Sequence, residues 1–423
     1  PYLAAKYGGG IFLIIYIVLA LTFGYTMIVA ETAIGRMTRK SPVGAFKSFG
    51  KKKWLSFGGW INAVIPVLIV PYYSVIGGWV IKYLVEYFRG NAKLLAEDGY
   101  FTDFISNGVS TELCFVAFCA FTLIIIFAGV QNGIERVSKI MMPILIVLSV
   151  IIAVYSVTRP GALAGVKYFL VPNVKNFSWM TVVSAMGQMF YSLSIAMGIL
   201  ITFGSYMKKD TAIEDSTRNV EVFDTGIAIM AGLMIIPAVF AFSGGDPDTL
   251  QAGPSLMFIT IPKVFQNMGF GTVIGIVFFL LVLFAAITSS IALTESAVST
   301  FEDELGWGRK KATVLVGVIM LVLGSLSSLG YGPLAGIKII GMQFLDLFDF
   351  LTNSVMMPIA ALLTSLLVSR VVGIDKIEDE IIHGESAFRR KKVFVVMIKY
   401  LCPVFAIIIL LSSVANALGW IKM

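Results

Sequence analysis

Long apolar segments recur along the whole chain and restrict its fold more than any other feature of the sequence. Ten of them approach or exceed the ~20 residues that a helix needs to cross a bilayer. Only structures that satisfy their own backbone hydrogen bonds can span lipid, so these segments are expected to be helical. They cover residues 11–38, 57–88, 113–130, 140–157, 180–206, 223–242, 272–300, 312–329, 339–372 and 393–418. With 58% hydrophobic and only 13% charged residues, the chain is predicted to be an all-α polytopic membrane protein.

Charge and reactive residues exclude several classes of function. The formal net charge is +7, but the basic residues lie in the loops between the segments, as membrane topology predicts, so no nucleic-acid partner is expected. Cys114, Cys119 and Cys402 all lie in apolar segments, and the single histidine, His383, lies in a polar loop. These residues suit neither a disulfide framework, nor a metal cluster, nor a catalytic triad. We therefore expect neither an enzyme nor an organic cofactor.

The distribution of lysine and arginine predicts the orientation in the membrane. If the loop after segment 11–38 is cytoplasmic, the loops on that side carry more than twice as many basic residues as those on the other. The excess places that side inside the cell. On the opposite side, the loop 244–270 contains "AGPSLMFITIPKVF". It is expected to form a short helical hairpin that packs into the outer surface.

The stretch "GQMFYSLSIAMG", from Gly187 to Gly198, is unusually polar for the middle of a membrane segment. One interpretation is a break in the helix, because backbone without helical hydrogen bonds is tolerated at this depth where it lines a cavity. Broken helices of this kind form midplane binding sites in transporters with inverted repeats. The other interpretation is a close helix contact through Gly187, Ser194 and Gly198.

Acidic residues within the apolar segments form a second group of candidates. Charges inside a membrane are costly and are usually functional. They are Glu31, Asp224, Glu295, and the pair Asp346 and Asp349, which lie one helical turn apart. The alternative for each is burial against neighbouring helices with satisfied hydrogen bonds.

Two helix faces offer donors for a ligand. Ala285, Thr288 and Ser289 lie at i, i+3 and i+4, so one carbonyl and two hydroxyls share a face. Oxygen ligands of this kind suit a small hard cation such as sodium, although serine and threonine also serve as small packing residues. In "PVLIVPYYSVIGGW", an apolar stripe with one phenol could line a pocket or simply pack, and it consists of Ile69, Tyr73 and Ile76.

Several stretches, in their order and spacing, resemble the neurotransmitter:sodium symporter family, in its bacterial amino-acid branch with the leucine-transporter fold. They are "PYLAAKYGGG", "ETAIGRMTRKSPVGAF", "PYYSVIGGW", "GQMFYSLSIAMGILITFGSYMKKD", "IIPAVFAFSG", "AGPSLMFITIPKVF" and "FAAITSSIALTESAVSTFEDEL". The resemblance extends from Pro1 to about Val372. It implies two inverted five-helix repeats, with residues 1–10 as a remnant of the first helix, 11–157 as helices 2–5 and 180–372 as helices 6–10. Residues 393–418 would form an eleventh helix.

The resemblance also implies roles for individual residues. The substrate pocket would contain Ile69, Tyr73, Ile76, Tyr191, Ser192, Ser194, Met197, Ser289 and Leu293. Within it, Tyr73 would bond the substrate carboxylate and Tyr191 would form an aromatic lid. Sodium would bind at Ser192 in a first site and at Ala285, Thr288 and Ser289 in a second, with Asp224 also counted among the sodium-binding residues.

Other positions match gating and structural elements of the family. Asp349 matches the outer gate, Asp303 and Tyr206 match the inner gate, and Glu31 matches a carboxylate that braces the unwound helices. A motif linked to unwinding of the fifth helix is matched by Gly133 and Pro143. The family's chloride site is matched by Tyr16, Gln188, Ser192 and Asp224, where the fixed acid Asp224 implies independence from chloride.

The resemblance implies a sodium-coupled symporter for neutral, hydrophobic or aromatic L-amino acids that works by alternating access. We expect a multi-pass protein of the bacterial inner membrane, monomeric or weakly dimeric, with the loops after helices 2, 4, 6, 8 and 10 in the cytoplasm. The sequence is expected to begin late in the first helix, without that helix's sodium ligands and outer-gate arginine. This form would then not catalyse coupled transport, although a full-length parent would. The alternative is an amino-acid sensor or a channel with a similar core and no sodium coupling.

Overall fold

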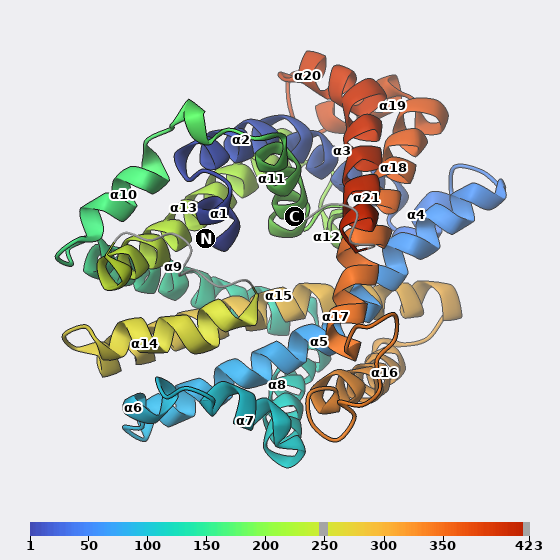
Figure 1. Ribbon diagram of the computed structural model, residues 1–423. Coiled ribbons are helices and arrows are strands. Elements are labelled where there is room, and N and C mark those ends of the chain that lie inside the picture. Colours follow the sequence, from blue (N-terminus) through green and yellow to red (C-terminus); the bar gives the residue numbers. More distant parts are fainter. Residues whose placement is uncertain (245–252, 418–423) are drawn as a thin grey trace.

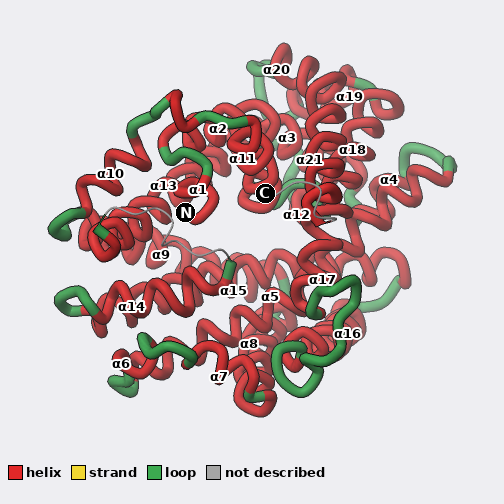
Figure 2. Tube along the Cα trace, viewed as in Figure 1, coloured by secondary structure: helices red, strands yellow, loops and turns green. Residues whose placement is uncertain are grey.

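The protein is a bundle of helices. The computed structural model describes residues 1–244 and 253–417, and this part of the chain contains no β-strand; Figure 2 shows the helices and the loops that join them. The first helices are α1 (Tyr2–Lys6), α2 (Gly10–Leu19), α3 (Tyr25–Thr38), α4 (Pro42–Lys47), α5 (Lys53–Phe88), α6 (Ala92–Leu95), α7 (Tyr100–Ser106), α8 (Gly108–Phe127), α9 (Arg136–Val157), α10 (Ala162–Leu170) and α11 (Trp179–Ser192). Those that follow are α12 (Ile199–Tyr206), α13 (Ile213–Ser243), α14 (Ile261–Gln266), α15 (Gly271–Leu305), α16 (Arg309–Leu329), α17 (Phe344–Asp349), α18 (Met357–Leu367), α19 (Ile374–Ile382), α20 (Lys391–Val396) and α21 (Cys402–Ala417).

Short turns of π-helix continue many of these α-helices. They are η1 (Ala20–Gly24), η2 (Val130–Glu135), η5 (Leu256–Thr260), η6 (Phe350–Met356), η7 (Val368–Val372) and η8 (Met397–Leu401), and η3 (Val174–Asn176) is a 3-10 turn. Counting these continuations, nine helices in the described residues are long and apolar enough to cross a membrane. The tenth predicted segment, 180–206, is interrupted between α11 and α12.

Most predicted segments match the observed helices, with differences at their ends. The helix predicted over 223–242 begins ten residues earlier, because α13 starts with a polar turn outside the apolar run. The segment predicted over 339–372 begins as a helix only at Phe344, because Ile339 and Met342 pair with each other through two backbone hydrogen bonds of 3.0 Å. The left-handed backbone of Gly341, with φ of +76°, makes that tight turn possible.

The loop predicted as an outer hairpin contributes one helical arm to the described structure. Residues 256–266 form η5 and α14 in continuous sequence, while residues 245–252 lie outside the described residues. The arm packs on α5, where Tyr83 donates a 2.7 Å hydrogen bond to the carbonyl of Phe258. The two rings lie 5.0 Å apart.

The two halves of the interrupted segment lie between different groups of helices. α5 packs along α8, α15 and α16, whereas α3 packs against α12 and α13 (Figure 1). α11 contacts α2 and α21, and α12 contacts α3 and α15. The interruption therefore lies at the junction of these groups, where a movement of either group would displace it.

Candidate functional site

The interruption covers residues 193–198, which we call the break. Ser194 and Ala196 have left-handed φ angles of 53° and 59°, and Gly198 has φ of 73°. Such angles are costly for residues other than glycine and concentrate at functional sites. The break therefore exists in the chain, as the first interpretation of this stretch predicted. Gly187 lies within α11, and a side chain added there would meet no atom within 4 Å of the described structure, so Gly187 makes no close helix contact there.

Glu31 on α3 reaches the break from the side. The backbone N–H of Ala196 donates a 2.7 Å hydrogen bond to its Oε1, and the Glu31 side chain is fully buried. Its Oε2 is buried with no hydrogen-bond partner among the described residues. A buried carboxylate oxygen with a free lone pair is costly unless another donor completes it, so Glu31 can accept one more hydrogen bond at the break.

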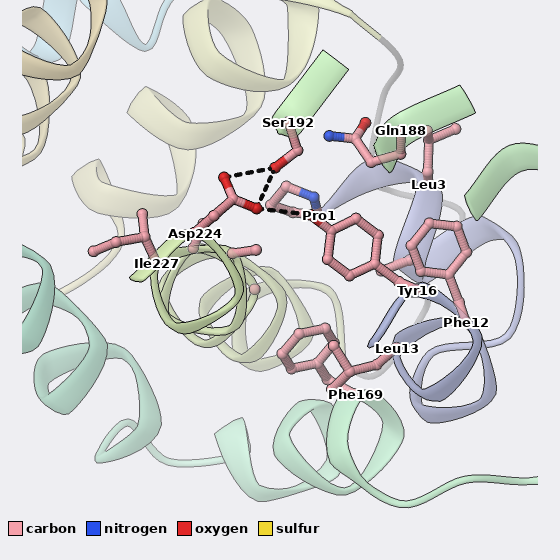
Figure 3. A pocket seen from close by; sticks show the side chains of 14 residues that line it. Pro1, Leu3, Phe12, Leu13, Tyr16, Phe169, Gln188, Ser192, Asp224 and Ile227 are labelled. Carbon is pink, nitrogen blue, oxygen red and sulfur yellow. Dashed lines mark hydrogen bonds between the residues drawn. The ribbon is translucent and has the colours of Figure 1, made fainter. Parts of the chain in front are cut away.

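Asp224 on α13 gathers the second group of polar side chains, seen in Figure 3. Its carboxylate accepts hydrogen bonds from the hydroxyl of Tyr16, at 3.0 Å, and from that of Ser192, at 3.0 and 3.1 Å. Gln188 lines the same cavity, of about 250 Å³. The structure thus brings together all four residues that the family resemblance placed at a chloride site.

A second cavity, of about 660 Å³, lies between α9, α13 and α15. Ala285, Thr288 and Ser289 line it, as does Pro143 of α9. The hydroxyl of Thr288 donates to the carbonyls of Phe284 and Ala285, at 3.1 and 3.0 Å. Because the proton is used in this way, the hydroxyl oxygen keeps its lone pairs for a cation. The donor set fits sodium, which prefers oxygen ligands.

Asp224 lines both cavities. Its carboxylate is held on one side by Tyr16 and Ser192, and the wall of the larger cavity carries the hydroxyls of Thr288 and Ser289. A fixed negative charge therefore lies beside the oxygen ligands, where it favours a cation.

Three of the residues predicted to form the apolar pocket are buried. Ile69, Met197 and Leu293 are buried in one hydrophobic cluster that spans α5, the break and α15. Tyr73 packs against this cluster and lies near Ser289. Tyr191, the next-to-last residue of α11, has 40% of its surface exposed. The partly buried members of the set are Tyr73, Ile76, Ser192 and Ser194, and Ser289 is exposed.

The predicted outer-gate residue Asp349 has partners of its own in this structure. It accepts a 3.1 Å hydrogen bond from Tyr72 and another from Asn353. Asp346, one turn away, accepts a 3.2 Å bond from Tyr331. The acids were predicted from the sequence, but their donors were not, although Tyr72 is the first tyrosine of "PYYSVIGGW".

At the other end of the bundle, the two inner-gate candidates have different hydrogen-bond partners. The hydroxyl of Tyr206 donates to Glu295, at 2.8 Å, and Arg309 binds the same carboxylate through two nitrogens, at 3.0 and 2.6 Å. Asp303 instead accepts from the backbone N–H of Ser41. Glu295 is thus paired by an arginine that the sequence analysis did not consider.

The fifth-helix positions lie where the chain changes helical type. Gly133 is in the π-helical turn η2, and a side chain there would meet the carbonyl oxygen of Ile125 at 2.1 Å. Pro143 lies inside α9 and lines the larger cavity. Both residues therefore weaken one helix beside that cavity.

Comparison with known proteins decides the family. The model of the sodium:neurotransmitter symporter family matches residues 1–94 and 101–420. The chain belongs to this family. It is 33% identical over 418 residues to the sodium-dependent transporter YhdH of Bacillus subtilis, covering 98% of this chain and 92% of that protein. It is 30% identical over 430 residues to a sodium-dependent transporter of Haemophilus influenzae, again covering 98% and 92%.

A solved member of the family shows the same fold. The crystal structure of MhsT in complex with L-phenylalanine superposes with a TM-score of 0.86 at 33% identity, covering 97% of this chain and 93% of that one. The chain therefore has the leucine-transporter fold, as the sequence stretches implied. As a member of this family it is a sodium-dependent membrane transporter and not an enzyme.

One buried ion pair was not found from the sequence. Arg36 of α3 is fully buried, and its Nε lies 2.6 Å from Oε1 of Glu380 on α19. Its other nitrogens donate to the carbonyls of Thr211, at 2.5 Å, and of Glu380. Arg36 belongs to the stretch "GRMTRK", but its partner lies 344 residues away in the sequence, so no local pattern indicates the pair.

Proposed function

We propose that this transporter carries neutral L-amino acids with an apolar side chain, aromatic ones included, together with sodium. The observation that carries the proposal is the break, flanked by the apolar cluster of Ile69, Met197 and Leu293. Ile69, Met197 and Leu293 are all apolar and buried, so they offer no partner to a charged substrate side chain. The crystal structure of MhsT with L-phenylalanine supports the same class of substrate.

Sodium would bind at the wall of the 660 Å³ cavity, on the oxygens of Ala285, Thr288 and Ser289. A second ion would bind at Ser192, whose hydroxyl already contacts Asp224. The freed backbone of residues 193–198 would face the amino and carboxylate groups of the substrate, because broken helices present such groups at their ends. Tyr73 would bond the carboxylate, and Tyr191 would cover the pocket.

Transport would proceed by alternating access around this site. Sodium and substrate would bind one state of the bundle better than the other and shift the population toward it. The end of the bundle with Lys40, Lys47 and Lys51 would face the cytoplasm of a bacterial cell. We propose a monomer or weak dimer as the working form.

The direct experiment reconstitutes the protein in liposomes and offers a panel of labelled amino acids with and without a sodium gradient. We expect sodium-driven uptake of leucine, phenylalanine or tryptophan and little uptake of lysine or glutamate. Binding of an amino acid without sodium-driven uptake would instead establish the sensor or channel alternative.

A pair of variants on one helix tests the sodium site. Thr288→Val removes a hydroxyl from the cavity wall, so the sodium concentration for half-maximal uptake should rise about tenfold or more, the usual effect of losing a contact to a charge. Thr300→Val is the control, because Thr300 makes a similar 3.0 Å bond to its own helix but does not line the cavity. Equal effects of the two variants would contradict the assignment.

We also propose that transport does not require chloride, because Asp224 supplies the negative charge beside Tyr16 and Ser192. Asp224→Ser should remove that charge and create chloride-dependent uptake. Asp346→Ser is the matched control, since Asp346 is an exposed carboxylate that lines neither cavity. Uptake by the Asp224 variant that is indifferent to chloride would refute the idea.

A further inference from the structure

The helix α5 begins with an uncompensated cluster of positive charge. Lys51, Lys52 and Lys53 immediately precede or open this helix of 36 residues. Its first turn contains no acidic residue, and its N-cap, Lys52, makes no side-chain hydrogen bond to the backbone. The N-terminus of a helix itself carries partial positive charge, so acids rather than lysines are stabilising there. Three lysines at this position add to the dipole instead of offsetting it.

These lysines have no counter-ion among the residues that the structure describes. All three are exposed, and none forms an ion pair within residues 1–244 and 253–417. The acid facing this region, Glu304 at the end of α15, is already paired with Lys47 at 2.6 Å. The positive charge at the start of α5 is therefore available to an external anion.

An exposed aromatic stripe continues directly from the lysines. Lys53, Phe57 and Trp60 lie at i, i+4 and i+7 and so share one face of α5. Phe57 is 55% exposed and Trp60 is 41% exposed. Lys47, already paired with Glu304, lies over the Trp60 ring, 5.7 Å from its centroid. In Figure 1, α4 and the loop that leads to α5 lie at the outer edge of the bundle.

This order of charge and apolar surface matches a phospholipid. α5 is long and apolar enough to cross a membrane, so we place its basic start at the membrane surface, with Phe57 and Trp60 one and two turns further toward the acyl chains. Tryptophan and basic residues are typical of this interface. A soluble anion would use the lysines but would leave the aromatic stripe without a partner.

We propose that Lys51, Lys52, Lys53, Phe57 and Trp60, which we call the lysine–aromatic surface, bind an anionic phospholipid. The phosphate headgroup contacts the lysines and the N-terminus of α5, and the first part of an acyl chain lies along Phe57 and Trp60. The chemistry recognised is a phosphate joined to an apolar chain. Each basic residue beside an anionic lipid surface strengthens binding about fivefold.

The test measures which lipid touches the aromatic stripe. The purified chain is placed in phosphatidylcholine nanodiscs that contain brominated phosphatidylglycerol or, separately, brominated phosphatidylcholine, and quenching of tryptophan fluorescence is titrated. We expect the anionic lipid to quench at an effective concentration at least about fivefold lower. Trp60→Phe should remove most of this difference, since Trp60 is the reporter on the surface. Equal quenching by the two lipids would overturn the proposal.

Two double variants, each of which removes two positive charges, test whether the lysine–aromatic surface is the binding site. Lys52→Gln with Lys53→Gln should remove most of the preference for phosphatidylglycerol, whereas Lys208→Gln with Lys209→Gln should leave it unchanged. Lys208 and Lys209 are also exposed but lie in the loop after α12. Because all four side chains are exposed, the variants should keep the melting temperature of the parent. A loss of preference in both variants would show a general charge effect and refute the site.

A further arm separates a lipid from a free anion. Inorganic phosphate, added at the concentration of the brominated lipid headgroups, should not displace the lipid, because it offers no apolar contact. Displacement by phosphate alone would overturn the assignment to lipid. Raising the salt concentration should weaken the preference for phosphatidylglycerol, and a preference insensitive to salt would contradict a role for the lysines.

Discussion

Gly198 is the position where the break should tolerate substitution least. Its φ of 73° costs a residue with a side chain about 1–2 kcal/mol. An added Cβ would also lie 2.7 Å from the carbonyl oxygen of Asn62 and 2.8 Å from Cγ of Pro42, and such overpacking costs about 1–3 kcal/mol. Gly198→Ala should therefore destabilise the fold by about 2–5 kcal/mol. Thermal unfolding in detergent should show a melting temperature lower by about 2–6 °C.

The chain offers its own control for this experiment. Gly187 opens the same polar stretch but lies inside α11, where an added Cβ meets no described atom within 4 Å. Gly187→Ala should be neutral or stabilising by up to about 1 kcal/mol through helix propensity. Sodium-driven uptake should be lost in the Gly198 variant and kept in the Gly187 variant. If both variants have the melting temperature of the unsubstituted protein, the left-handed conformation of Gly198 and its close approach to Asn62 do not stabilise the break.

Two further predictions concern the charged end of the bundle. Arg36→Met or Glu380→Leu alone should each cost about 3–5 kcal/mol, because each leaves a buried charge unpaired. The double variant should recover most of the loss in a double-mutant cycle of melting temperatures, and strictly additive losses would contradict the pair. Burial, with the neighbouring carboxylates of Glu214 and Asp215, raises the pKa of Glu385 above its ordinary 4.5. The stability that this carboxyl contributes is therefore fully present below about pH 4.5 and is lost as the pH rises through the raised pKa. Glu385→Gln, which stays neutral, should flatten that part of the curve of melting temperature against pH, and an unchanged curve would contradict the shift.

Local patterns in the sequence were sufficient for the membrane helices and for the break. Apolar runs of bilayer length predicted the positions of the helices, because lipid imposes the same rule on every span. The concentration of glycine and hydroxyl residues between Gly187 and Gly198 predicted an interruption, which the left-handed angles at residues 194, 196 and 198 confirm. In both cases the physical cause lies within a few residues of its effect.

The partners of the charged residues could not be predicted in this way. Glu31 contacts Ala196 and Arg36 contacts Glu380 across 165 and 344 residues, and neither distance leaves a periodic signal. The start of α13 was missed for a related reason. Its first turns are polar because they face the buried pairs at the end of the bundle, where Glu221 binds Arg390 at 2.7 Å, and a hydropathy pattern treats such a turn as loop.

Asp224 lines both cavities, so its charge can act on ligands in either of them. If the charge of Asp224 served only the smaller cavity, the hydrogen bonds from Tyr16 and Ser192 would be its only functional contacts. The carboxylate would then have no electrostatic effect on the larger cavity, which Thr288 and Ser289 also line. A carboxylate beside oxygen ligands raises the affinity for a cation on whichever side it faces. Replacing Asp224 with serine should therefore weaken sodium binding in the absence of chloride, and chloride should restore it. If the substitution makes uptake depend on chloride but leaves sodium binding unchanged, the two cavities act independently. This one substitution therefore decides whether they act as one site.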